Sequence, residues 1–181
     1  MSDEKTSTAP KKETWLNWLA VTTILFSTCA TISTFRGGGH SSKAMMAQVE
    51  ASDFWAQYQS KSIKQYIYGT QADLLDLRAQ ELPAGAMADA YRAKAERDRK
   101  DMARYETDKK EIAEKAHAIE AQRSENQRHG GRFGLAVVFL QMAIMLSALA
   151  AILKKKPLWL AGVLSGLVGV IYFADGFFVL F

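Results

Sequence analysis

The sequence has little of what catalytic and metal sites are usually built from. It contains 1 cysteine and 3 histidines in 181 residues, and it has no CxxC motif, no HExxH motif and no phosphate-loop lysine. One cysteine excludes an internal disulfide. No Ser-His-Asp set for nucleophilic catalysis is recognisable either. From these absences we expect a protein that is not an enzyme and that uses no cofactor.

Charge of one sign is also scarce. The 23 lysines and arginines stand against 19 aspartates and glutamates, a formal net charge of +4. Between residues 91 and 127 the two signs are finely mixed, whereas a nucleic-acid surface gathers basic side chains on one face. We therefore expect no nucleic acid among the partners.

Charged residues are missing from two long segments and nearly missing from a third. Residues 15–35 and 133–153 carry none, and residues 157–181 carry only Asp175. A helix of about 20 apolar residues crosses the hydrocarbon core of a bilayer. We therefore predict three transmembrane helices in contact with membrane lipid, at residues 14–35, 133–153 and 157–181.

The first apolar segment has an alternative interpretation as a cleaved signal peptide, with Lys11 and Lys12 as its basic region. Cys29 would then suggest a lipoprotein, but Phe26 and Thr28 fit a lipoprotein cleavage site badly. The segment is also long for a signal peptide. We favour the transmembrane helix and expect Cys29 to be a small packing residue.

The residues outside the apolar segments predict a tail and two long helices. Residues 1–13 form a polar tail of mixed charge, which is typical of disorder. Residues 43–128 have helical character, broken by Pro-Ala-Gly at residues 83–85, where proline cannot continue a helix. The predicted fold class is all-α, with three transmembrane helices and a long extramembrane antiparallel helical hairpin similar to a coiled coil.

Apolar residues recur at steps of three, four and seven in both arms of this hairpin. In the first arm they are Met46, Val49, Ala56, Ile63, Ile67, Leu74 and Leu77, interrupted by Asp53, Ser60 and Thr70. In the second arm they are Tyr91, Ala95, Met102, Tyr105, Ile112, Ala116 and Ile119, interrupted by Asp98 and Lys109. We expect the two stripes to face each other. So narrow a seam buries little area, which predicts that the hairpin needs neighbours.

Two glycine clusters flank the hairpin, in TFRGGGHSS at residues 34–42 and in QRHGGRF at residues 127–133. A phosphate-binding loop follows a strand and ends in Lys-Ser/Thr, whereas an apolar helix precedes the first cluster. Glycine also ends helices and lets the chain leave at a new angle. We therefore predict hinges at residues 36–42 and 129–132. They would be formed by Gly37, Gly38, Gly39, Gly130 and Gly131.

Folding the chain back at residues 83–85 places residues opposite each other when their numbers sum to roughly 169, because both helices rise about 1.5 Å per residue. This brings His40 beside His129, with His117 about three turns away. Two imidazoles fall short of the three or more ligands of a usual metal site, so we expect no metal.

The lysines favour one orientation in the membrane. Residues 154–156 form a basic turn of three lysines, and the tail carries Lys5, Lys11 and Lys12. Five further basic residues stand at the root of the hairpin: Arg36, Lys43, Arg123, Arg128 and Arg132. Short loops weigh most in the positive-inside rule. We therefore place the N-terminus and the basic turn in the cytoplasm and the hairpin in the periplasm of a bacterial inner membrane.

Three stretches carry a resemblance to a known family. They are WLNWL at residues 15–19, GGGH at residues 37–40 and, most specific, EASDFWAQYQSKSIKQ at residues 50–65. With these stretches the chain resembles the domain-of-unknown-function 4337 family, small bacterial membrane proteins with one helix, a charged helical middle and two closing helices. The resemblance covers most of the chain and implies this architecture without implying an activity.

The last of these stretches is also the candidate docking surface. Its polar stripe consists of Glu50, Asp53, Gln57, Lys61 and Lys64, and its neighbouring aromatic stripe consists of Trp55, Tyr58 and Tyr66. Tryptophan and tyrosine are favoured at protein interfaces because one end is apolar and the other forms hydrogen bonds. Docking of another subunit is one interpretation, and packing of the aromatic residues over the second arm is the alternative.

Polar groups inside the apolar segments are the other candidates. Gln141 and Asp175 are expected at a similar depth, and an intramembrane carboxylate is costly enough to suggest a function. Asp175 could take part in ion or proton conduction, form hydrogen bonds between helices, or lie near the headgroups, where Arg132 could pair with it. The third segment also carries a small-residue face, which suits either self-association or packing within the chain. Its members are Gly162, Ser165, Gly166 and Gly169.

These observations lead to two functional hypotheses. The first is a membrane assembly, scaffold or accessory subunit that uses its hairpin for self-association or for docking in a larger membrane complex. The alternative is a homo-oligomeric ion or proton channel, or an ion-coupled component, lined by Gln141 and Asp175. The sequence identifies no small-molecule ligand for either hypothesis.

Overall fold

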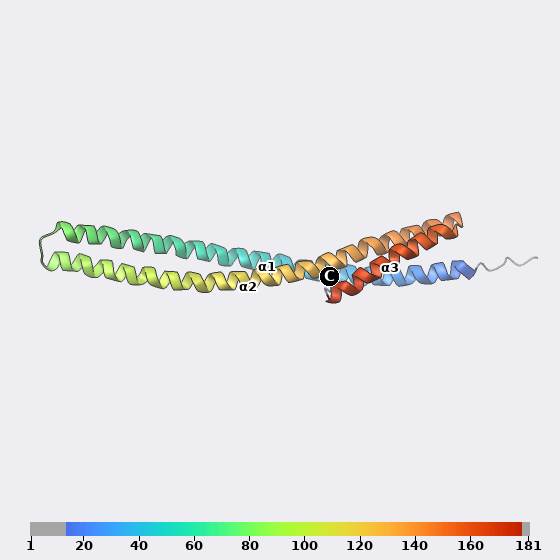
Figure 1. Cartoon of the computed structure of the whole chain (residues 1–181), viewed down its shortest axis with the longest axis horizontal. Coiled ribbons are helices and arrows are strands. Elements are labelled where there is room, and N and C mark those ends of the chain that lie inside the picture. The colour runs from blue at the N-terminus through green and yellow to red at the C-terminus, as the bar shows by residue number, and fades with distance from the viewer. Residues whose placement is uncertain (1–13, 179–181) are drawn as a thin grey trace, which may run out of the picture. The chain divides into compact units, whose positions relative to one another are not determined.

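The computed structural model of the protein describes residues 14–178, which form three helices and no strand. Helix α1 spans Thr14–Glu81, α2 spans Ala86–Leu153 and α3 spans Lys156–Phe178 (Figure 1). Each contains a stretch long and apolar enough to cross a membrane. The predicted all-α class with three membrane-compatible helices is thus confirmed. The predicted tail, residues 1–13, lies outside the described residues.

The helix ends follow from local chemistry. Pro83 and Gly85 lie between α1 and α2, and the backbone N–H of Asp89 donates to the carbonyl of Gly85 at 3.1 Å. At the end of α2, Lys154 adopts a left-handed φ of 50° and the N–H of Lys155 donates to the carbonyl of Ala150 at 3.3 Å. This six-to-one hydrogen bond closes the helix in a Schellman motif. Pro157 then suits the first turn of α3, where its missing N–H costs nothing.

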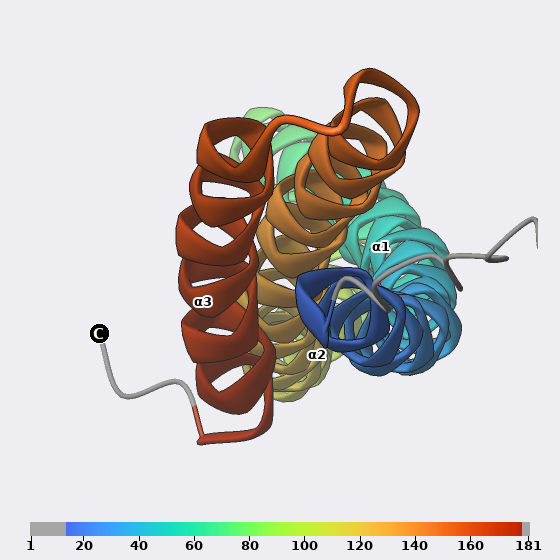
Figure 2. The same cartoon turned by 90° about the vertical axis from the view of Figure 1, so that its right-hand side faces the viewer.

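The chain divides into two compact units. The first contains the described parts of Met1–Ser41 and Gln127–Phe181, and the second contains Ser42–Asn126. In the first unit α3 lies beside the last part of α2 (Figure 2). Its core joins Phe26 and Ala30 of α1 to Leu140 of α2, with Tyr172 and Phe173 of α3 packed against it. Cys29 is half-buried beside this core.

Small residues of α3 let the helices of the first unit approach closely. A Cβ at Gly166 would lie 2.3 Å from the ring of Phe26, and one at Gly169 would lie 2.7 Å from Cγ of Leu140. The hydroxyl of Ser165 donates to the carbonyl of Phe139 at 3.0 Å. A Cβ at Gly162 would also contact α2. The small-residue face therefore packs within the chain in this structure.

The glycine clusters do not end helices, which corrects the prediction of hinges. Gly37, Gly38 and Gly39 lie inside α1, and Gly130 and Gly131 lie inside α2. No described glycine has a positive φ, so none uses the conformation that glycine alone adopts readily. Glycine permits a helix end but does not impose one.

Two of these glycines instead allow close contact between α1 and α2 in the first unit. A Cβ at Gly37 would lie 3.0 Å from Cβ of Phe133, and one at Gly130 would lie 3.3 Å from Oγ of Ser41. A Cβ at Gly38, Gly39 or Gly131 would meet open space. Close approach thus explains Gly37 and Gly130, and nothing in the structure requires glycine at the other three positions.

In the second unit, α1 and α2 lie side by side and run in opposite directions (Figure 1). Side-chain contacts join Gln48 to Arg123, Trp55 to Glu120, Lys61 to Asp108 and Asp76 to Arg99. The residue numbers rise along α1 as they fall along α2. The stripe predicted for α2 faces α1, since Ala95 and Ala116 are fully buried and the other five members are half-buried.

The stripe predicted for α1 faces away from α2, which corrects the predicted seam. A second series on α1, displaced around the helix, makes the contact instead, and we call it the inner seam. Its members are Ala47, Ala51, Phe54, Tyr58, Lys61, Gln65, Tyr68, Ala72, Leu75 and Ala79, none of which is exposed. Its four alanines are buried, between 0% and 8% exposed. Its polar members have hydrogen-bonding partners on α2.

Candidate functional site

The site that the structure offers is the exposed face of α1 in the second unit. We call it the outer seam: Met46, Val49, Asp53, Ala56, Ser60, Ile63, Ile67, Thr70, Leu74 and Leu77, all of which are exposed. Its six large apolar side chains are between 46% and 71% exposed. Scattered apolar residues on a surface need no explanation, but a continuous row of them marks an interaction site.

The inner seam fixes which face of α1 is presented. Both seams advance by alternating steps of three and four residues, so each keeps its place around a helix that supercoils with a partner. At 3.5 residues per turn their centres lie about 150° apart. Burying the inner seam against α2 therefore directs the outer seam away from α2.

The predicted docking residues are divided between these two faces. Trp55, Tyr58 and Lys61 are half-buried and contact α2. The other five members are exposed, either on the outer seam or beside it: Glu50, Asp53, Gln57, Lys64 and Tyr66. The structure thus does not bring the eight residues onto one surface.

Two aromatic members of the predicted docking surface, Trp55 and Tyr58, form part of the contact with α2. Trp55 donates its indole N–H to Oε1 of Glu120 at 2.9 Å, and its ring packs edge-on against His117 at 5.2 Å. Nδ1 of His117 lies 3.1 Å from Oε2 of Glu120. The hydrogen bond from Trp55, helped by His117, lowers the pKa of Glu120 below its usual value.

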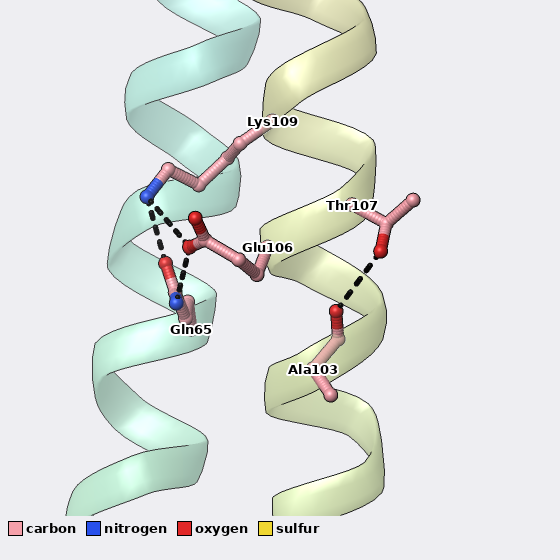
Figure 3. A network of polar contacts seen from close by, with 5 residues as sticks. All are labelled: Gln65, Ala103, Glu106, Thr107 and Lys109. Atoms are coloured by element: carbon pink, nitrogen blue, oxygen red, sulfur yellow. Dashed lines mark hydrogen bonds and ion pairs between the residues drawn. The ribbon is translucent and has the colours of Figure 1, made fainter.

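A polar network lies further along the inner seam (Figure 3). The side-chain amide of Gln65 donates to Oε2 of Glu106 at 2.7 Å, and its oxygen accepts from Nζ of Lys109 at 2.8 Å. Lys109 also lies 3.4 Å from Oε2 of Glu106. The hydrogen bond from Gln65 and the ammonium charge of Lys109 lower the pKa of Glu106. This arrangement fixes the register of the two helices, because one amide must meet two opposite charges.

Further contacts strengthen the same junction. Nζ of Lys61 lies 2.6 Å from Oδ2 of Asp108 and 5.2 Å from the ring centre of Tyr105. Tyr105 stacks on Tyr68 with 5.6 Å between centres, and repulsion between the two phenolates raises the pKa of Tyr68. A groove of about 440 Å³ runs beside Gly69, where Met102 approaches to 3.2 Å of a Cβ position. The groove is lined by Ser62, Gln65, Tyr66, Gly69, Thr70, Asp73, Met102 and Lys109.

The intramembrane polar residues do not meet. Gln141 is exposed on α2, whereas the side chain of Asp175 is 1% exposed and its Oδ2 lies 3.1 Å from Nε of Arg132. That ion pair sets the register of α2 against α3, and it places Gln141 level with residues near 166, about 13 Å along the helix from Asp175. The predicted cluster of Gln141 and Asp175 is therefore absent within one described chain. The pairing of Asp175 with Arg132, left open by the sequence, is present.

The predicted meeting of two histidines is confirmed. The rings of His40 and His129 stack with 4.8 Å between centres, and His40 also stacks on Phe133 at 6.1 Å. Nδ1 of His129 lies 2.8 Å from the carbonyl oxygen of Gly176, so this nitrogen carries the hydrogen. Among residues 14–178, no three His, Cys, Asp or Glu side chains come together in a way that could hold a metal ion.

The sequence predicted the wrong orientation for the apolar residues of the outer seam, which were expected to face α2. The signal that could have placed them was present, because the same segment carries a second series of three- and four-residue steps, beginning at Ala47. Two such series on one helix indicate two contact faces. The series with more large aliphatic side chains is the exposed one, which reverses the usual inference from hydrophobicity.

Comparison with known proteins gives one match. The model of the family described as domain of unknown function (DUF4337) matches residues 15–179. No curated protein and no solved structure matches the chain.

Proposed function

The chain belongs to this family, and from that premise we propose that it is a non-enzymatic membrane protein for assembly, a scaffold or accessory subunit. Its second unit forms an antiparallel helical hairpin outside the membrane. The apolar stretches of its three helices anchor it in the lipid. The hairpin serves as the surface through which subunits associate.

The observation that carries this proposal is the exposed outer seam. Met46, Ile63 and Leu74 are 71%, 61% and 58% exposed, and only a rotation of α1 by about 150° would turn them toward α2. Leaving such side chains in water costs about 1.5–3 kcal/mol each relative to burial. A row of them is stable against aggregation only when a partner covers it.

The inner seam supports the proposal because it makes the hairpin a firm platform. The contacts of Trp55, Lys61 and Gln65 with α2 hold the rotation of α1 about its axis. A docking face held in one orientation loses less entropy when it binds. The polar contacts of the inner seam thus have a structural role, because they hold the outer seam in one orientation.

We propose a bacterial inner membrane as the location, with the N-terminus in the cytoplasm and the hairpin in the periplasm. The support is the distribution of basic residues. Lys154 and Lys155 form a short exposed turn between α2 and α3, and the exposed Lys156 begins α3. Short basic loops favour the cytoplasmic side. A cysteine introduced at Ala84 and labelled in intact cells tests the orientation, since a membrane-impermeant reagent labels it only if the hairpin lies outside the cytoplasm.

The native mass of the complex tests the proposed function. The protein is extracted in mild detergent from the membranes of its own host, and its mass is compared with the 20.1 kDa of one chain. We expect a complex of several subunits that falls apart when Leu74→Glu and Leu77→Glu are introduced together. A matched control carries Ala90→Glu and Ala93→Glu, at exposed positions of α2 with the same three-residue spacing. A wild-type protein that runs as one chain, with no other subunit, overturns the proposal.

A further inference from the structure

We infer that the outer seam of α1 packs against the outer seam of a second copy of this chain, parallel and in register. This inference rests on the proposed function and names the partner of the same surface. The contact is a two-helix coiled coil between hairpins, formed in addition to the coiled coil inside each hairpin.

The spacing of the outer seam indicates a helical partner. Its ten positions advance from Met46 to Leu77 by strict alternation of three and four residues. An apolar row with that repeat stays in contact only with another helix that winds around it, because an isolated helix turns every 3.6 residues and the row would drift. The row covers more than four heptads, and three to four are enough to indicate a coiled coil.

Seven of the ten positions are apolar and the other three are polar. Met46, Val49, Ala56, Ile63, Ile67, Leu74 and Leu77 are the apolar members. The last four of them lie in the half of the seam nearer the α1–α2 turn. We therefore expect most of the binding free energy to come from residues 63–77. Ser60 and Thr70 are uncharged layers that a two-helix interface tolerates.

The direction of the partner follows from anchoring. Two copies inserted in one membrane with the same topology present their α1 helices in the same direction. Anchoring also restricts the copies to a surface, which raises their effective concentration. Anchoring in the membrane therefore favours a parallel pair of α1 helices.

The residues that flank the seam fit a parallel, in-register pair. Each heptad of the outer seam has two seam positions, three residues apart. In such a pair the residue just before the first of these two positions faces the residue five places later in the second copy. Asp73 then faces Arg78, an attractive pair. The remaining flanking pairs carry no like charges: Met45 with Glu50, Ser52 with Gln57, Gln59 with Lys64, and Tyr66 with Gln71. All ten of these residues are exposed, although within the chain Arg78 also pairs with Glu81 at 3.2 Å and Asp73 lies 3.8 Å from Arg99.

Asp53 is the one unfavourable layer and provides the sharpest test. In an in-register pair of identical chains, Asp53 faces its own counterpart, and two carboxylates at that distance repel. Neutralising it must therefore strengthen pairing between identical copies. A foreign helix that offers a cation opposite Asp53 would be bound more weakly after the same change.

Disulfide trapping in membranes tests the geometry with the full chain. In a Cys29→Ser background, Ile63→Cys places a thiol at the predicted interface, and Ala103→Cys places one on the exposed face of α2 as a control. After treatment with copper phenanthroline we expect a product of twice the single-chain mass for Ile63→Cys and not for Ala103→Cys. Mixing Ile63→Cys with Leu77→Cys chains should give no mixed product, because the two positions lie about 21 Å apart in register.

Two further variants make the result decisive. Ile63→Glu with Ile67→Glu should reduce the trapped dimer, followed through Leu74→Cys, at least about tenfold, since charged side chains in the seam cost more than 1.4 kcal/mol. Ala103→Glu with Thr107→Glu has the same four-residue spacing on the exposed face of α2 and should leave the dimer unchanged. Asp53→Asn should increase the dimer severalfold. Circular dichroism shows whether each variant keeps its helices.

The outcomes separate this inference from the proposed function. Trapping at Ile63→Cys that Asp53→Asn enhances supports the inference. Trapping only to a foreign subunit, weakened by Asp53→Asn, overturns the second copy as partner and leaves the assembly function standing. Equal trapping at Ile63→Cys and Ala103→Cys overturns the inference as random collision. A wild-type protein that extracts as a single chain overturns both.

Discussion

Trp55 of α1 donates its indole N–H to the carboxylate of Glu120 on α2, with 2.9 Å between Nε1 and Oε1. The same tryptophan belongs to the predicted docking surface. The structure uses its polar edge to hold the two helices of the second unit in register. The contact therefore links the stability of this unit to the protonation of one carboxyl group.

This link predicts a loss of stability in acid. The pKa of Glu120 in the folded protein lies below the ordinary value of 4.5, mainly because Trp55 donates to the carboxylate. The stabilisation is complete above pH 4.5 and disappears as the pH falls through the lowered pKa, because the unfolded chain binds the proton more readily. Trp55→Phe keeps a ring but removes the donor, so its melting temperature should fall less between pH 6 and pH 3.

Circular dichroism of the full chain in detergent measures this dependence. Trp18→Phe serves as the control, since Trp18 is exposed and lies in the first unit. Equal acid sensitivity of wild type and Trp55→Phe would show that the hydrogen bond does not set the pKa of Glu120. Gln65→Leu should reduce the acid sensitivity in the same direction, because Gln65 is the main cause of the lowered pKa of Glu106.

The alanines between the two helices predict a strong dependence on side-chain size. Ala95 is fully buried on α2, whereas Ala93 two residues earlier is exposed. Ala95→Leu should destabilise the second unit by about 1–3 kcal/mol because the added atoms force the helices apart. Ala93→Leu should change the stability by less than about 0.5 kcal/mol. Chemical denaturation in detergent compares the two, and equal effects would contradict the described seam.

The close contact of α3 with α2 gives a similar prediction in the first unit. A Cβ at Gly169 would lie 2.7 Å from Cγ and 3.0 Å from the backbone nitrogen of Leu140. Gly169→Ala should therefore cost about 1–3 kcal/mol despite the better helix propensity of alanine. At Gly134 a Cβ meets open space, so Gly134→Ala should be neutral or stabilising. Resistance to unfolding in mixed detergents ranks the variants, and a stabilised Gly169→Ala would refute the contact.

The buried ion pair predicts coupling between Arg132 and Asp175. Asp175 is almost fully buried, and its Oδ2 lies 3.1 Å from Nε of Arg132. Asp175→Asn should destabilise the first unit by about 1–3 kcal/mol, since a guanidinium loses its opposite charge in a poorly solvated place. In combination with Arg132→Gln the loss should be smaller than the sum of the two single losses. Arg128→Gln, on an exposed arginine of the same helix, is the control.

The same Asp175→Asn variant bears on the alternative of a channel or ion-coupled component. A scaffold keeps the ion flux and the membrane potential of cells unchanged when this carboxylate is neutralised. A conducting protein does not. Flux measured in proteoliposomes at equal protein content distinguishes the two, and a change would transfer the function from the outer seam to α3.

Sequence reasoning placed the elements well because each depends on local chemistry. Pro83 interrupts the helices, the apolar segments determine three membrane-compatible helices, and the pairing of residue numbers brought His40 to His129. It failed where two local patterns compete. On α1 both seams have the periodicity of a contact face, and the choice between them depends on the shape of α2. Ala72 is fully buried in this contact, and Lys61 and Gln65 find partners on α2.

The glycine clusters show the same limitation in a different form. Gly37 sits against Phe133 and Gly130 against Ser41, contacts that no sequence window reveals. The expected break was based on what glycine permits. The structure follows the lower-energy course in which the helix continues and every backbone hydrogen bond is kept.

Two seams on one helix, one buried and one exposed, have a consequence for how this protein can vary. Along α1 from residue 46 to residue 79, four of every seven positions belong to the inner or the outer seam, and the positions beside them carry the flanking charges. On α2 only one seam exists in the corresponding segment. Random substitutions should accumulate more slowly in α1 than in α2, and a complete substitution library should show a broad intolerant band in one helix and a narrow, periodic one in the other.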